Sequence, residues 1–164
     1  VSGKNKIPMA ELRSLLDNHG LKKVQTYIQS GNLVFRSDLT KGQLETTIAE
    51  SILKRFGLEV PVLVLTSSEI EAIINDNPYK HEDLTKLYVT FLAEPPSQEK
   101  LDSLPASPNP REKYRIKDQA IYVYCPDGYG RTKINNNFFE NKLKVTATTR
   151  NWKTCLKLSE MTEF

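Results

Sequence analysis

Residues 22–35 read KKVQTYIQSGNLVF, and this stretch decides the fold of the first part of the chain. Apolar or β-branched side chains alternate with polar ones over residues 23–29, which is the period-two pattern of a half-buried strand. Residues 30–32, SGN, have the composition of a tight turn, and residues 33–36 follow as a second strand-forming run. The stretch therefore predicts a β-hairpin.

Helical patterns lie on both sides of this hairpin. Residues 8–19 begin with a proline, carry leucines at helical spacing and are followed by a glycine, as an amphipathic helix requires. Residues 41–56 show the same spacing of apolar side chains, and a glycine again follows them. Residues 60–65, VPVLVL, are short and apolar on both faces, so they predict a buried strand.

The second half of the chain has a similar succession of patterns. The expected elements are a short helix capped by Ser67 or Ser68, a strand at 87–93, a helix at 97–104, a hairpin within 113–125, and helices at 133–142 and 149–161. The proline-rich residues 105–110 and the turn-forming residues 127–130 are expected to be loops.

The two successions would match if one strand preceded Val1. The predicted fold is therefore α+β, with two ferredoxin-like β-α-β-β-α-β halves packed as one globular unit. The expected boundaries are 1–66 for the N-terminal half, 67–85 for a helical connector, and 86–164 for the C-terminal half with an extra C-terminal helix. No residue-level repeat accompanies this match.

Three segments carry a resemblance to a known family: GKNKIPMAELRSLL, TYIQSGNLVF and TKINNNFFENKLKVTATTRNWKTCLKL. Together they closely resemble the bacterial family called domain of unknown function 1697. The resemblance implies that an apolar first strand, ending in an Arg-Gly-Ile-Asn-like sequence, is missing ahead of Val1. It implies no activity, because that family is named for the lack of one.

Composition excludes several classes of protein. The chain has 164 residues, 38% of them hydrophobic and 26% charged, with no apolar run that approaches the length of a membrane span. Cys125 and Cys155 are expected to be free buried thiols in a reducing cytoplasm, with a disulfide between them as the alternative. Because His19 and His81 lie apart from each other and from the cysteines, we expect no metal site, and no sequence motif predicts a cofactor.

The net charge of +3 is unevenly distributed. Residues 131–157 contain seven basic residues and a single acid, Glu140, so this stretch carries +6 and the rest of the chain −3. Such a concentration of positive charge favours an anionic partner. A solvated basic face is the alternative.

Residues 146–154, TATTRNWKT, lie within the basic stretch at the predicted start of the last helix. Thr148 or Thr149 is the predicted N-cap, and no acid follows in the first turn to balance the helix dipole. A bound phosphate or carboxylate would do so. The predicted anion-binding residues are Thr148, Thr149, Arg150, Asn151 and Lys153.

An alternative structural interpretation stays open for this stretch. In it, threonine hydroxyls accept hydrogen bonds from the first N–H groups of the helix, Arg150 points into water, and Trp152 anchors the helix in the core. Further donors could join an anion site: Lys4, Asn5, Lys6, Gln29, Ser30, Asn32, Arg131 and Lys133.

Three functions remain open from the sequence. The first is a module that binds a phosphate-bearing ligand, a nucleotide or nucleic acid, through the basic C-terminal helices. The second is an enzyme acting on a small anionic substrate at the same helix start, although no catalytic residue can be named. The third is a non-catalytic interaction or assembly domain, and the oligomeric state is not predicted.

Overall fold

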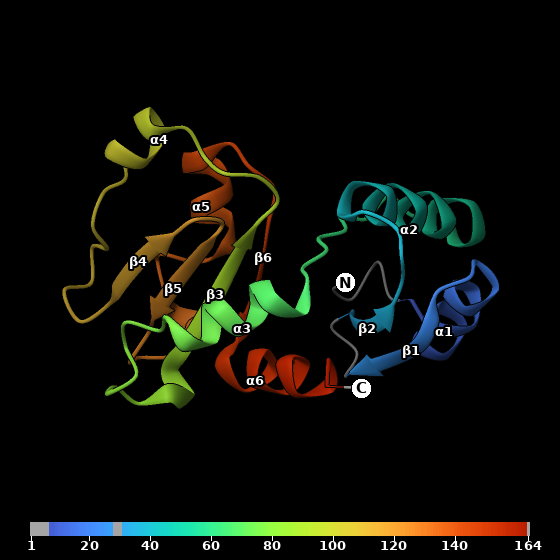
Figure 1. Cartoon of the computed structure of the whole chain (residues 1–164). Helices are drawn as coiled ribbons and strands as arrows, with labels where there is room; N and C mark the ends of the chain where they lie inside the picture. The colour runs from blue at the N-terminus through green and yellow to red at the C-terminus, as the bar shows by residue number, and fades with distance from the viewer. Residues whose placement is uncertain (1–6, 28–30, 164) are drawn as a thin grey trace. The chain divides into compact units, whose positions relative to one another are not determined.

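The computed structural model describes residues 7–27 and 31–163, and these residues form a mixed α and β fold with six α-helices and two antiparallel sheets (Figure 1). The chain divides into two compact units. Unit 1 contains Val1–Ser68 and Lys157–Phe164, and unit 2 contains Glu69–Leu156. No helix in the described ranges is long and apolar enough to cross a membrane.

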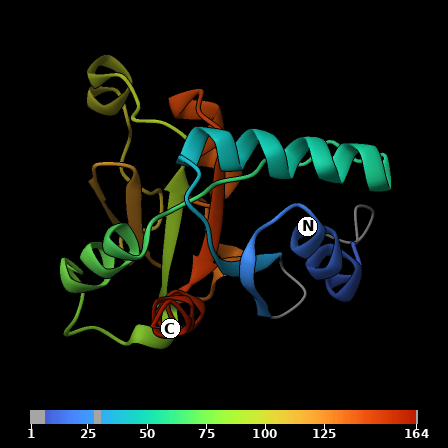
Figure 2. The ribbon, with the colours of Figure 1, turned by 45° about the vertical axis from the view of Figure 1, so that its right-hand side comes forward.

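Unit 1 is built on the predicted hairpin and its two flanking helices. Its elements are α1 (Met9–Asn18), β1 (Lys22–Tyr27), β2 (Asn32–Arg36) and α2 (Lys41–Phe56). Helix α2, seen along its side in Figure 2, begins with a reciprocal capping box between Thr40 and Gln43. It ends at Gly57, whose φ of 69° is the left-handed conformation that glycine adopts without strain.

The hairpin of unit 1 is antiparallel, with Gln25 opposite Val34 and Tyr27 opposite Asn32. Its register shifts between Lys22 and Gln25, where Lys23 has a φ of 53°. This bulge inserts an extra residue on β1 and so ends the strict alternation predicted for the strand. The core of unit 1 consists of apolar side chains from the hairpin and both helices: Ile7, Leu12, Leu16, Leu21, Val24, Leu44, Ile48 and Ile52.

The predicted strand at residues 60–65 is wrong, since the chain is not a strand anywhere between α2 and α3. This segment nevertheless packs every second side chain against the core of unit 1, namely Val60, Val62 and Val64. Such a two-residue period is the one that a half-buried strand would show. A strand also needs a hydrogen-bonded neighbour. Among the described residues β2 pairs only with β1, and no strand pairs with residues 60–65.

Unit 2 contains a four-stranded sheet with helices on its connections. Its elements are α3 (Ser67–Asn75) from Glu69 onward, η2 (Leu84–Lys86), β3 (Leu87–Leu92), α4 (Gln98–Asp102), β4 (Lys113–Lys117), β5 (Ala120–Tyr124), η3 (Tyr129–Arg131), α5 (Asn136–Leu143), β6 (Ala147–Asn151) and the first half of α6 (Trp152–Met161). The strand order is β4-β5-β3-β6, and every neighbouring pair is antiparallel.

The predicted last helix begins three residues too early. Residues 147–151 form β6, which pairs with β3 through Thr148 opposite Phe91 and Arg150 opposite Val89. The prediction that Thr148 or Thr149 caps the helix is therefore wrong. Asn151 occupies the capping position, and its Oδ1 accepts from the backbone N–H of Thr154 at 2.8 Å.

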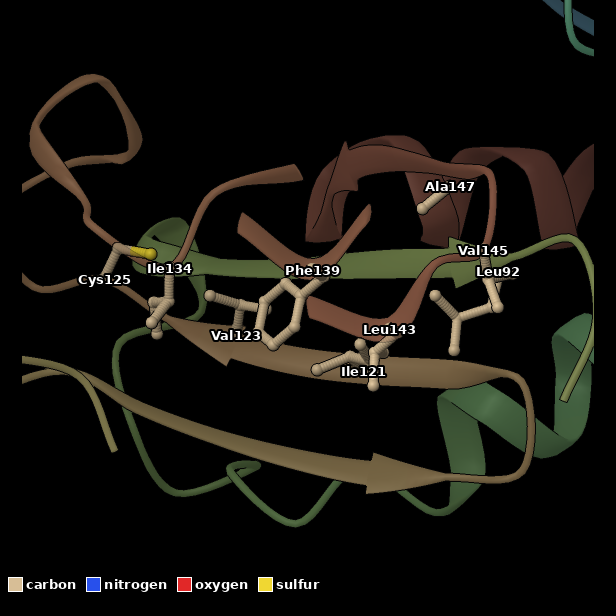
Figure 3. Packing of buried hydrophobic residues seen from close by; sticks show 9 residues of the cluster. All are labelled: Leu92, Ile121, Val123, Cys125, Ile134, Phe139, Leu143, Val145 and Ala147. Atoms are coloured by element: carbon tan, nitrogen blue, oxygen red, sulfur yellow. The ribbon is translucent and has the colours of Figure 1, made fainter. Parts of the chain in front are cut away.

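The core of unit 2 lies between α5 and one face of the sheet. Phe139 and Leu143 of α5 lie over Val123 and Ile121 of β5 (Figure 3). The other face of the sheet is covered too, because Tyr122 is buried and its hydroxyl donates to the carbonyl of Ile73 in α3 at 2.6 Å. Neither face of β5 is therefore open to a ligand.

Candidate anion-binding edge

Strand β6 forms one edge of the sheet in unit 2, and its outward backbone groups can be identified from its pairing. The N–H of Ala93 donates to the carbonyl of Thr146 at 2.8 Å, so Thr146 turns its backbone groups toward β3. Because these groups alternate along an antiparallel strand, Thr148 and Arg150 also face β3. Ala147, Thr149 and Asn151 consequently turn their N–H and C=O groups to the outer edge.

Side chains already form hydrogen bonds with several of these outward-facing N–H and C=O groups. The Ala147 N–H donates to Glu140 Oε2 at 2.9 Å, and the Ala147 carbonyl accepts from Asn136 Nδ2 at 3.0 Å. The Thr149 carbonyl accepts from Arg150 Nη1 at 2.9 Å. The N–H groups of Thr149 and Asn151 have no acceptor among the residues that the structure describes. Among the described residues, this edge therefore leaves two N–H donors without an acceptor, whereas the carbonyls of Ala147 and Thr149 already accept side-chain hydrogen bonds.

Arg150 lies along this edge and is half-buried. Its Nη1 also donates to Thr148 Oγ1 at 2.7 Å, so the Thr148 hydroxyl serves the guanidinium. Burial lowers the pKa of Arg150, and the nearby Cys155 opposes that change. An arginine retains its charge even so, and the guanidinium adds a fixed positive charge beside the two open N–H groups.

The Thr149 hydroxyl belongs to a buried polar network. It donates to Asn136 Oδ1 at 2.8 Å and lies 2.8 Å from the hydroxyl of Thr90, which is completely buried. The backbone N–H of Asn136 in turn donates to the Tyr129 hydroxyl at 2.8 Å. Thr149 can therefore offer a ligand its N–H but not its hydroxyl. The sequence contains no sign of this network, because its members come from four separate elements, β3, η3, α5 and β6.

The other predicted donors are distributed as follows. Lys153 is exposed in the first turn of α6, which contains no acid, as expected. Arg131 and Lys133 are exposed ahead of α5. Asn32 is buried in unit 1, where its Nδ2 donates to the Tyr27 carbonyl at 3.2 Å and closes the hairpin. The remaining predicted donors, Lys4, Asn5, Lys6, Gln29 and Ser30, lie outside the described residues.

Two groups of basic residues in unit 2 differ in how their charges are balanced. Near β4, Arg111 pairs with Asp127 at 2.6 Å, Lys113 with Glu82 at 2.9 Å, and Lys117 with Asp76 at 2.5 Å. Within the basic stretch of residues 131–157, five exposed residues form no ion pair with any described residue, and we call them the unpaired cations: Arg131, Lys133, Lys142, Lys144 and Lys153. Elsewhere in unit 2, the exposed Lys80 and Arg115 also form no ion pair with a described residue.

A groove of about 390 Å³ in unit 1 is a poor alternative for an anion. It is lined by apolar side chains, including Leu53 and Val60, and its two charged residues are Glu50 and Glu59. Two carboxylates would repel a phosphate group, whereas the unpaired cations would attract one.

Thiol and metal chemistry gain no support from the described residues. Cys125 and Cys155 are free and completely buried, as predicted for their thiols, and no group of metal-ligating side chains occurs in the described ranges. Burial raises the pKa of Cys125 to about 11, although a hydrogen bond with Thr132 opposes this. Burial likewise raises the pKa of Cys155 to about 12. Both thiols are protonated at neutral pH and are poor nucleophiles.

These raised pKa values predict low thiol reactivity and an alkaline loss of stability. Neither cysteine should react with a disulfide reagent at about pH 8 in the folded protein, and both should react in concentrated urea. In the folded protein the pKa values of both thiols exceed the unfolded value of 9.0, so the protonated thiols favour the folded state. This contribution to the free energy of unfolding is fully present below about pH 9. It is lost as the pH rises toward 11. Urea midpoints that stay constant from pH 8 to pH 11 would contradict this.

Comparison with known proteins agrees with the resemblance in the sequence. The family described as "Protein of unknown function (DUF1697)" matches residues 1–122. The solved structure of the conserved bacterial protein SP0830 from Streptococcus pneumoniae is similar, with 28% sequence identity and a TM-score of 0.73. The similarity covers 99% of this chain and 93% of that one. No curated protein matches the sequence. With three quarters of its length matched, the chain belongs to the DUF1697 family of proteins of unknown function.

Proposed function

We propose that unit 2 binds a phosphate-bearing ligand, a nucleotide or a nucleic acid, at the edge of β6 and the surrounding basic residues. The observation that carries this proposal is the set of five unpaired cations. The single acid among residues 131–157, Glu140, uses a carboxylate oxygen to hold the Ala147 N–H. Positive charge without a local counterion attracts phosphate groups. Binding also releases the cations that are condensed around the phosphates of a nucleic acid.

The donor groups of the β6 edge fit the same ligand. Backbone N–H groups and a guanidinium make charge-assisted hydrogen bonds to phosphate oxygens, which accept but do not donate when ionised. The open N–H groups of Thr149 and Asn151 lie beside the guanidinium of Arg150 on this edge. Lys153, two residues after Asn151, adds an exposed positive charge.

We further propose that the two halves are ferredoxin-like, with the C-terminal half at 86–164 and the connector at 67–85. The element order from β3 to β6 and the strand order β4-β5-β3-β6 support this for the C-terminal half. Sheets of this kind can bind RNA by stacking bases on exposed aromatic side chains. Tyr122 is buried beneath α3, so an edge site is the better proposal here.

The alternatives of an enzyme and of an assembly domain gain no specific observation. An enzyme would need an acid or base at the ligand. Glu140, the sole acid of the basic stretch, is engaged by the Ala147 N–H.

Removal of two unpaired cations tests the proposal. The double variant Lys133→Gln/Lys153→Gln should bind a fluorescein-labelled oligonucleotide about tenfold more weakly at low salt, since each lost charge contributes up to about 1 kcal/mol. Fluorescence anisotropy measures the affinity. The matched control is Arg111→Gln/Lys117→Gln, which removes the same charge from residues paired with acids and should change affinity less than about twofold.

Equal weakening by both double variants would mean that only net charge matters, and the proposed location would be wrong. No binding by the unmodified protein to oligonucleotides, nucleotides or inorganic phosphate would overturn the function itself.

A further inference from the structure

We infer that the ligand of the β6 edge and the unpaired cations is a single strand of nucleic acid, contacted along several phosphates, and not a nucleoside monophosphate. This inference rests on the proposed function. It depends on three features of unit 2: the spacing of the open donors, the occupied carbonyls of the edge, and the distribution of the cations.

The two open donors are too far apart for one phosphate. Thr149 and Asn151 are two residues apart on an extended strand, which places their N–H groups about 6.8 Å apart. This exceeds the separation of oxygens within a single phosphate group. A mononucleotide phosphate could therefore satisfy one donor and leave the other unpaired. Successive phosphates of an extended strand can satisfy both.

The edge fits the other extended ligand, a peptide strand, less well. Strand addition requires the edge to offer carbonyl acceptors as well as N–H donors. Asn136 occupies the Ala147 carbonyl and Arg150 occupies the Thr149 carbonyl. The N–H groups of a peptide would compete with these side chains for the two carbonyls, whereas a phosphodiester backbone needs donors only.

The unpaired cations are also spread too widely for one phosphate. Arg131 and Lys133 precede α5, while Lys142 and Lys144 lie at its other end. With eight residues, α5 is about 12 Å long. Cations at both ends of α5 can be neutralised together only by a ligand that carries several charges along its length.

The aromatic residues of this region favour contact with the backbone and not with bases. The ring of Tyr129 stacks on Tyr88 with 4.6 Å between centroids, and its hydroxyl accepts from Asn136. Tyr88 therefore covers one face of the Tyr129 ring, and we expect binding with little sequence preference. Helix α5 contains one basic residue, Lys142, and α6 contains Lys153 and Lys157, the second of which lies 3.7 Å from Glu160. A duplex is therefore less suitable, because neither helix offers a row of unpaired basic side chains to a groove.

Binding of a length series to the full chain tests this inference. The probes are thymidine monophosphate and labelled oligothymidylates of increasing length, with an oligouridylate and a duplex of the same length for comparison. Affinity should rise with length, and the monophosphate should bind more than about a hundredfold more weakly than the longest oligomer. The logarithm of affinity should fall against the logarithm of salt with a slope of about −2 or steeper, since each phosphate contact on a single strand contributes about −0.7.

The variant Lys133→Gln/Lys153→Gln should make that slope shallower by about 1.4, whereas Arg111→Gln/Lys117→Gln should leave it unchanged. A monophosphate that binds as tightly as the oligomers, or a slope near −0.7, would overturn the inference and leave the proposed function standing. Tighter binding of the duplex would also overturn it. Failure of every probe to bind would overturn the proposed function itself.

Discussion

The variant Phe139→Ala should lower the free energy of unfolding by about 3–5 kcal/mol, the usual cost of removing a buried aromatic ring. Phe139 is completely buried in the core of unit 2. Its ring meets Tyr114 and Phe138 edge to face, with centroids 5.2 and 5.0 Å apart. The substitution therefore removes two aromatic contacts as well as buried area, and it leaves a cavity over Val123 of β5 (Figure 3).

Urea unfolding followed by circular dichroism measures this loss. Phe138→Ala is the matched control, because Phe138 is the neighbouring residue on α5 and is only half-buried. It should cost clearly less, and Phe139→Leu should cost less than Phe139→Ala because most of the volume is kept. Equal losses for Phe138→Ala and Phe139→Ala would contradict the packing of α5 on the sheet.

The elements that could be predicted from the sequence are those specified by local patterns. The hairpin at 22–36 and helix α2 follow from alternation, helical spacing and a capping glycine, all within a few residues of one another. The two errors concern strands, at 60–65 and 147–151. Outside a hairpin, whether a segment is a strand depends on a neighbour that is distant in sequence. β6 has such a partner in β3, and residues 60–65 have none among the described residues.

The candidate site divides in the same way. The basic stretch and the single acid within it are visible in the sequence, so the concentration of positive charge could be predicted. The open N–H groups of Thr149 and Asn151 could not, because only the register with β3 shows which backbone groups face outward. The hydrogen bond between the hydroxyls of Thr149 and Thr90 could not be predicted either, because the two residues are 59 positions apart in the sequence.

The variant Leu16→Ala should lower the free energy of unfolding by about 2–5 kcal/mol, through its effect on the core of unit 1. Leu16 is completely buried, and the cluster around it joins α1 to α2 and the hairpin. No disulfide or buried ion pair occurs in the described part of this unit, so apolar packing is its main source of stability. The small size of that core makes each methyl group a large fraction of the total.

Leu15→Ala is the matched control on the same helix. Leu15 is half-buried beside the cluster, and its truncation should cost less than about half as much because solvent fills part of the space. Both variants keep the helix propensity of α1 nearly unchanged, since alanine is the best helix former. A difference between them therefore measures burial alone. Equal effects of the two substitutions would mean that α1 does not present Leu16 to the core, and the packing of unit 1 would be wrong.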